Sequence, residues 1–161
     1  MSHSKKIVLL GHFGVGKTSL VRQFVESEFS EDYLVTVGVH IKKKELTLGD
    51  EKISLIIWDI EGNTAIEKAR NSYLLGSHGF VYVFDITRPE TYEELSSELQ
   101  YLDKHHQNVP YCVVGNKSDL FDEELNPQFF EKMGITNCFF TSAKTGDSVE
   151  AMFTELAEKL I

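Results

Sequence analysis

The stretch Gly11-His12-Phe13-Gly14-Val15-Gly16-Lys17-Thr18 decides how the rest of the chain is interpreted, because it matches the pattern G-x-x-x-x-G-K-[ST]. Glycines in such a loop let successive backbone N–H groups turn inward around a phosphate, and the helix that follows adds its positive end. The lysine reaches the terminal phosphates of a nucleotide, and the threonine hydroxyl binds Mg²⁺. The sequence therefore predicts a phosphate site at this loop.

The segments around this loop alternate between strand-like and helix-like hydrophobic periods. The predicted strands are Lys6–Leu10, Val37–Leu48, Lys52–Trp58, Phe80–Phe84, Tyr111–Val114 and Cys138–Thr141. The predicted helices are Ser19–Glu26, Thr64–Leu75, Thr91–His105, Pro127–Met133 and Ser148–Leu160. Gly49-Asp50 between the second and third strands indicates a hairpin. We therefore expect an α/β fold with a six-stranded, mainly parallel sheet, one antiparallel edge strand and helices on both faces.

Two helix starts carry local signals. Asn126-Pro127 is typical of an N-cap followed by a proline in the first helical position. Asp147 with Glu150 fits a capping box at the start of the last helix.

Length and composition limit the classes of function. The 161 residues, 42% of them hydrophobic, suit a single globular domain that spans residues 1–161. Sixteen Lys and Arg against 25 Asp and Glu give a net charge of −9, which repels phosphate backbones and anionic membrane surfaces. Lys42-Lys43-Lys44 is too short a basic run to reverse this repulsion. We expect no binding to nucleic acid.

The cysteines and the ends of the chain predict where the protein resides. Cys112 and Cys138 have no metal-ligand spacing and lie in apolar runs, as buried thiols do in a reducing compartment. No apolar run approaches the ~20 residues of a membrane-spanning helix, and the first residues do not form a signal peptide. No cysteine near Ile161 is available for prenylation. We expect a cytoplasmic protein without a membrane anchor in this chain, and a lipidated tail beyond Ile161 stays open.

Two further motifs follow later strands and select the base. Asn116-Lys117-Ser118-Asp119 ends the fifth strand, and Ser142-Ala143-Lys144 ends the sixth. The carboxylate of Asp119 can accept hydrogen bonds from the ring N–H and the exocyclic amine of guanine, a donor pair that adenine lacks. The backbone N–H of Ala143 can donate to the guanine oxygen. These motifs therefore indicate a guanine nucleotide.

Taken together and in this order, the motifs resemble those of the small GTPases of the Ras superfamily over essentially the whole chain. Thr36-Val37-Gly38-Val39, Trp58-Asp59 and Ser142-Ala143-Lys144-Thr145-Gly146 resemble the Rab branch most. The resemblance implies the fold of P-loop NTPases, GTP or GDP bound with Mg²⁺, and hydrolysis of GTP. It also implies effector, exchange-factor and activating proteins that bind at two switch loops. We expect a monomer.

The resemblance implies a role for each motif residue. The residues that cradle the phosphates are Gly14, Val15, Gly16, Lys17, Thr18 and Ser19. Those that hold Mg²⁺ are Thr18, Thr36 and Asp59. Those that act in hydrolysis are Lys17, Thr36, Gly62 and Asn63. The remaining nucleotide contacts come from Phe29, Tyr33, Asn116, Lys117, Asp119, Ser142, Ala143 and Lys144.

Three residues near the γ-phosphate depart from the family pattern. Asn63 stands where the family has a water-orienting glutamine, and Glu61 replaces a small apolar residue. Phe13 stands where the phosphate loop normally has a small residue, on the side from which an arginine finger enters. Two interpretations stay open: a nucleotide switch with slow hydrolysis, or a pseudo-GTPase scaffold with little or no hydrolysis. The guanine motifs argue against a third, a P-loop kinase.

Overall fold

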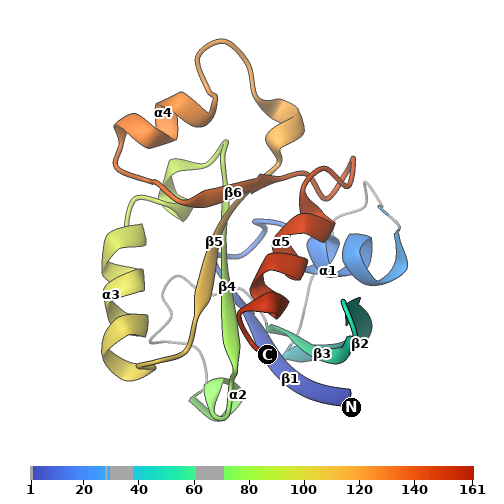
Figure 1. Cartoon of the computed structure of the whole chain (residues 1–161). Helices are drawn as coiled ribbons and strands as arrows, with labels where there is room; N and C mark the ends of the chain where they lie inside the picture. The colour runs from blue at the N-terminus through green and yellow to red at the C-terminus, as the bar shows by residue number, and fades with distance from the viewer. Residues whose placement is uncertain (1, 28, 30–37, 61–70) are drawn as a thin grey trace.

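Six strands pair into one sheet in the order β2-β3-β1-β4-β5-β6 (Figure 1). The structure is a computed structural model that describes residues 2–27, 29, 38–60 and 71–161. Its strands are β1 Ser2–Leu10, β2 Val39–Leu48, β3 Glu51–Ile60, β4 Gly79–Asp85, β5 Tyr111–Asn116 and β6 Cys138–Thr141. Every neighbouring pair is parallel except β2 and β3, which are antiparallel at one edge. The predicted sheet is therefore confirmed.

Helices cover both faces of the sheet. Figure 1 shows α1 and α5 on one face and α3 on the other, with α4 beside the edge strand β6. The helices are α1 Lys17–Glu26, α2 Asn71–Leu74, α3 Leu95–His105, α4 Pro127–Lys132 and α5 Val149–Glu158. The part of the chain that the structure describes also contains the 3-10 helices η2 Pro89–Thr91 and η3 Ser118–Leu120. Among the described residues, no helix has both the length and the apolar surface that crossing a membrane requires.

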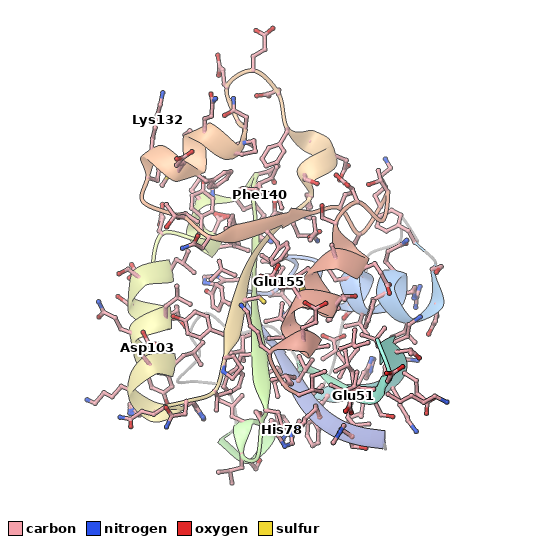
Figure 2. All side chains as sticks on the ribbon, in the orientation of Figure 1. Glu51, His78, Asp103, Lys132, Phe140 and Glu155 are labelled. Carbon is pink, nitrogen blue, oxygen red and sulfur yellow. The ribbon has the colours of Figure 1, made fainter. Side chains whose placement is uncertain are left out.

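The two faces of the sheet bury different side chains. Under α1 and α5 the core is mostly aliphatic, with Phe24 stacked on Phe153 at a ring-centroid distance of 4.1 Å. On the other face, aromatic rings from β4, α4 and β6 meet, and Phe130 lies 5.4 Å from Phe84 and 5.5 Å from Phe140. Figure 2 labels Phe140 on β6, whereas charged Lys132 projects outward from α4. Each fully buried aromatic or aliphatic side chain stabilises the fold by roughly 1.5–3 kcal/mol.

Several element boundaries differ from the prediction. β1 begins at Ser2 rather than Lys6, because polar residues at its start pair in register with Lys52–Leu55 of β3. The start of α4 is confirmed, since the Asn126 side chain accepts a hydrogen bond from the N–H of Phe129. The capping box at Asp147 is wrong: Ser148 is the N-cap of α5, in the left-handed conformation with φ 59° and no side-chain cap bond. The predicted helix Thr64–Leu75 is described only from Asn71, and Asn71–Leu74 is helical.

Both cysteines are free thiols, as their apolar surroundings predict. Cys112 is buried and Cys138 is half-buried. Burial raises the pKa of the Cys138 thiol to about 12, with a smaller opposing effect from the backbone of Gly115. Burial also raises the pKa of the Cys112 thiol, so both thiols favour the neutral form near neutral pH.

Candidate nucleotide site

The parallel strands deliver the motif residues to one edge of the sheet. Because these strands are parallel, the carboxyl ends of β1, β4, β5 and β6 meet at that edge. The loops that follow these strands carry residues 11–16, 86–88, 117 and 142–148. In open parallel sheets, ligands bind at this edge.

The phosphate loop lies so close to β4 and β5 that two of its positions accept only glycine. A Cβ on Gly11 would lie 2.2 Å from the backbone oxygen of Val83, and one on Gly16 would lie 2.3 Å from Nδ2 of Asn116. Both residues also have positive φ, at 144° and 101°. The glycines of the motif are therefore required by the close approach of the loop to the sheet.

Every backbone carbonyl from Gly11 to Gly16 accepts a hydrogen bond. The donors come from three parts of the chain: α1, the turn after β4, and the end of β5. The hydrogen bonds run from Lys17 Nζ to Gly11 O at 3.1 Å and to His12 O at 3.1 Å, from Arg88 Nη1 to Phe13 O at 3.0 Å, from Lys117 Nζ to Gly14 O at 3.4 Å, from Asn116 Nδ2 to Val15 O at 3.0 Å, and from Leu20 N to Gly16 O at 2.9 Å. In a planar trans peptide the N–H points opposite to the C=O. Holding the carbonyls outward therefore leaves N–H groups to form a concave anion site.

Lys17 is a buried cation at the base of this loop. Lys17 is 6% exposed, and burial lowers the pKa of its ammonium group from 10.5 to about 8, an effect that nearby Asp59 partly opposes. The burial of the charged form therefore costs stability fully below pH 8, and the cost is relieved between pH 8 and 10.5. A phosphate beside Lys17 would stabilise the charged form.

The residues predicted to hold Mg²⁺ lie next to each other where the structure describes them. Thr18 Oγ1 donates a hydrogen bond to Asp59 Oδ2 at 2.5 Å, and Asp59 is 2% exposed. Hydroxyl and carboxylate oxygens are the hard ligands that Mg²⁺ prefers, usually with oxygens from a phosphate. Within the described ranges, no three His, Cys, Asp or Glu side chains cluster to hold a metal ion. This pair fits a magnesium ion that takes further oxygens from a nucleotide.

Asn116 connects the phosphate loop to the loops after β5 and β6, which carry the predicted base contacts and are called the base loops below. Its side chain is buried, and besides the bond to Val15 O, its Oδ1 accepts hydrogen bonds from Thr141 Oγ1 at 3.2 Å and from Ala143 N at 3.3 Å. The neighbouring Lys117 has a left-handed backbone, with φ 72°. Its ammonium lies 2.7 Å from Oδ2 of Asp85, which is fully buried. The two residues therefore fix the relative position of four strand ends.

The side chains predicted to contact the guanine base are more exposed than Lys17 and Asn116. Asp119 is exposed, and its Oδ1 accepts a hydrogen bond from the buried Ser142 hydroxyl at 2.8 Å. The same hydroxyl accepts from the N–H of Thr145 at 3.1 Å. Phe29 is 38% exposed, and Lys144 is exposed. The serine thus orients the carboxylate that is predicted to bind guanine.

A family model described as the Ras family matches residues 6–161. The chain belongs to the Ras family. Its P-loop NTPase fold is therefore shown by both the sheet and the match. Members of the Ras family are GTP-binding switch proteins, in general GTPases, that work through regulators and effectors.

For this Ras family protein, the structure places the predicted residues unequally. Gly14, Val15, Gly16, Lys17, Thr18 and Ser19 lie in or directly after the phosphate loop, with Ser19 half-buried in the first turn of α1. Tyr33, Thr36, Glu61, Gly62 and Asn63 lie outside the described residues. Their predicted roles at the γ-phosphate therefore stay predictions.

Two residues that sequence reasoning missed also belong to the site. Asp85 holds Lys117, and Arg88 holds the phosphate loop at Phe13. Asp85 directly follows the predicted strand Phe80–Phe84 and Arg88 lies three residues further on, at the edge where ligands are expected. Charged residues after a buried strand were the signal that could have found them.

Proposed function

We propose that this Ras family protein is a Mg²⁺-dependent switch that binds GTP or GDP and slowly hydrolyses GTP to GDP. The observation that supports it most is the contact between Thr18 and Asp59 directly beside the buried Lys17. This contact gathers a cation and two hard oxygen ligands at a loop that suits phosphates. Asp119 with Ser142 supports guanine as the base.

The chain's own residues would act mainly by positioning the nucleotide and stabilising charge. The N–H groups of the phosphate loop and the ammonium of Lys17 would bind the phosphates, while Thr18 and Asp59 would hold the metal. When bound, Mg²⁺ supplies positive charge to the phosphate oxygens during transfer. Thr36 and Gly62 would contact the γ-phosphate, and effectors would recognise the loops that carry them.

The proposed rate is slow because two side chains differ from the family pattern. Asn63 has the amide of the expected glutamine but is one methylene shorter, and a misplacement near 1 Å can cost about 10²-fold in rate. Phe13 is 49% exposed, so that its ring would crowd an arginine finger from an activating protein.

Single-turnover hydrolysis combined with analysis of the bound nucleotide tests this function. We expect the purified protein to retain GDP or GTP and to hydrolyse GTP on the order of 10⁻³ s⁻¹ or more slowly. Removing Mg²⁺ with EDTA should accelerate nucleotide release. The double variant Phe13→Gly with Asn63→Gln should hydrolyse faster, and Glu61→Ala measured in parallel separates any help from that carboxylate.

The outcomes distinguish the two interpretations. Retained nucleotide without any turnover, in the wild type and in the double variant, would favour the pseudo-GTPase scaffold. Absence of bound guanine nucleotide would contradict both.

A further inference from the structure

The connection between β4 and α3 is folded tightly onto itself beside the phosphate loop. The Thr91 hydroxyl accepts a hydrogen bond from Asp85 N at 2.9 Å and lies within hydrogen-bond distance of Arg88 O at 2.7 Å. Oδ1 of the fully buried Asp85 accepts from both the N–H and the hydroxyl of Thr87, at 2.8 and 2.6 Å. The backbone of Arg88 is therefore fixed from both sides.

From this rigid turn the guanidinium of Arg88 reaches the phosphate loop. Its Nη1 donates to the backbone oxygen of Phe13 at 3.0 Å, and its Nε donates to Oε1 of Glu90 at 3.2 Å. The pKa of nearby His12 is lowered, first by burial and then by the charges of Arg88 and Lys17, with an opposing effect from Glu90. Arg88 thus places a cation at the tip of the loop.

This contact differs from the other supports of the loop. Lys17, Asn116 and Lys117 belong to the nucleotide motifs of the sequence, whereas Arg88 belongs to none of them. Phe13 O and Gly14 N share one planar peptide unit, so a bond that fixes the oxygen also fixes the direction of the N–H. Gly14 has φ 78° and no side chain. Because glycine adopts many backbone conformations, Gly14 itself does little to keep this peptide in one orientation.

We propose that Arg88 is a positioning residue of the phosphate site, which holds the Phe13–Gly14 peptide so that the Gly14 N–H points at the diphosphate of a bound guanine nucleotide. This role rests on the proposed function. It predicts that loss of the guanidinium loosens GDP and GTP alike, because both carry the diphosphate.

Dissociation of fluorescent GDP and of a fluorescent, non-hydrolysable GTP analogue tests the role of Arg88. Arg88→Met keeps most of the stem but removes the donors, and we expect both nucleotides to dissociate about five to ten times faster. Arg88→Lys restores a charged donor of similar reach and should recover most of the loss. Lys159→Met is the matched control, since Lys159 is an exposed cation paired with Glu155 on α5, and its rates should equal those of the wild type.

A second measurement separates positioning from a general effect on stability. In the GDP complex, the amide resonance of Gly14 should shift in Arg88→Met, return toward its place in Arg88→Lys, and stay unchanged in Lys159→Met. A lower melting temperature of Arg88→Met with unchanged dissociation rates and an unchanged Gly14 resonance would overturn the proposal. Wild type that retains no guanine nucleotide would instead overturn the proposed function.

Discussion

The phosphate loop and the base loops lie at the same edge of the sheet but are held to different degrees. Each carbonyl from Gly11 to Gly16 accepts a hydrogen bond, and Lys17 below them is buried. Asp119, in contrast, is exposed and is oriented by the hydroxyl of Ser142. The difference teaches that the fold itself shapes the phosphate loop, whereas the side chain that is predicted to select the base lies at the surface.

Removing Asn116 should break this comparison most strongly, because its side chain contacts both regions. Asn116→Ala deletes the bonds to Val15 O, Thr141 Oγ1 and Ala143 N in a buried setting. We expect GDP affinity to fall by about 10²- to 10³-fold, since each unpaired buried group costs about 1–3 kcal/mol. Calorimetric titration of the nucleotide-stripped protein measures the affinity.

Asn126→Ala is the control for this substitution. Asn126 caps α4 through the N–H of Phe129, away from the phosphate loop. Its loss should lower the free energy of unfolding by about 1 kcal/mol and leave GDP affinity unchanged. Equal GDP affinity in Asn116→Ala and Asn126→Ala would show that Asn116 does not couple the two regions.

Asp119→Asn should change the base site and leave the phosphate site intact. The Oδ1 of an asparagine can still accept from Ser142, and its NH₂ then faces the donors of guanine. We expect GTP affinity to fall by about 2–3 kcal/mol and xanthosine triphosphate, which has a carbonyl in place of the amine, to bind better than in the wild type.

Competition between the two nucleotides measures this exchange of preference. Asp122→Asn is the matched control, because Asp122 is a nearby exposed carboxylate that accepts from the N–H groups of Glu124 and Leu125. If Asp119→Asn and Asp122→Asn keep the same preference for GTP, Asp119 does not read the base.

The sequence predicts the loops at the carboxyl edge of the sheet well where the local sequence pattern agrees with the long-range packing. The glycines of the phosphate loop carry their own conformational signal, and alternation of strands and helices implies where the loop lies. The start of α3 was predicted at Thr91, but the helix begins at Leu95, because the Thr91 hydroxyl bonds back to Arg88 O and Asp85.

Contacts between distant residues are what the sequence could not predict. The bond from Arg88 to Phe13 joins residues 75 positions apart, and neither residue type indicates the other. The prediction that Asp147 caps α5 was wrong for a related reason. The N–H of Ser142 donates to Asp147 O and fixes the turn before the helix, so that Ser148 is the N-cap. Four predicted site residues lie outside the described residues, and their roles stay predictions: Tyr33, Thr36, Gly62 and Asn63.

The smallest predicted effect concerns the protonation of Lys17. Its pKa is lowered to about 8 in the protein without ligand, and a bound phosphate raises it again by stabilising the ammonium. The contribution of this group to GDP affinity is therefore fully present below pH 8. Above pH 8 it falls by up to about tenfold per pH unit until the pKa of the complex is reached.

The central claim is that a buried lysine, partly deprotonated near pH 8, lies at the phosphate site and becomes charged when a phosphate binds. Proton uptake on GDP binding tests this claim most directly. Titrations of the nucleotide-stripped protein at pH 8.0, in two buffers with different ionisation enthalpies, give the number of protons bound with GDP. We predict an uptake of about half a proton for the wild type and none for Lys17→Arg, whose guanidinium stays charged. The same uptake in both proteins, or none in the wild type, would contradict the account.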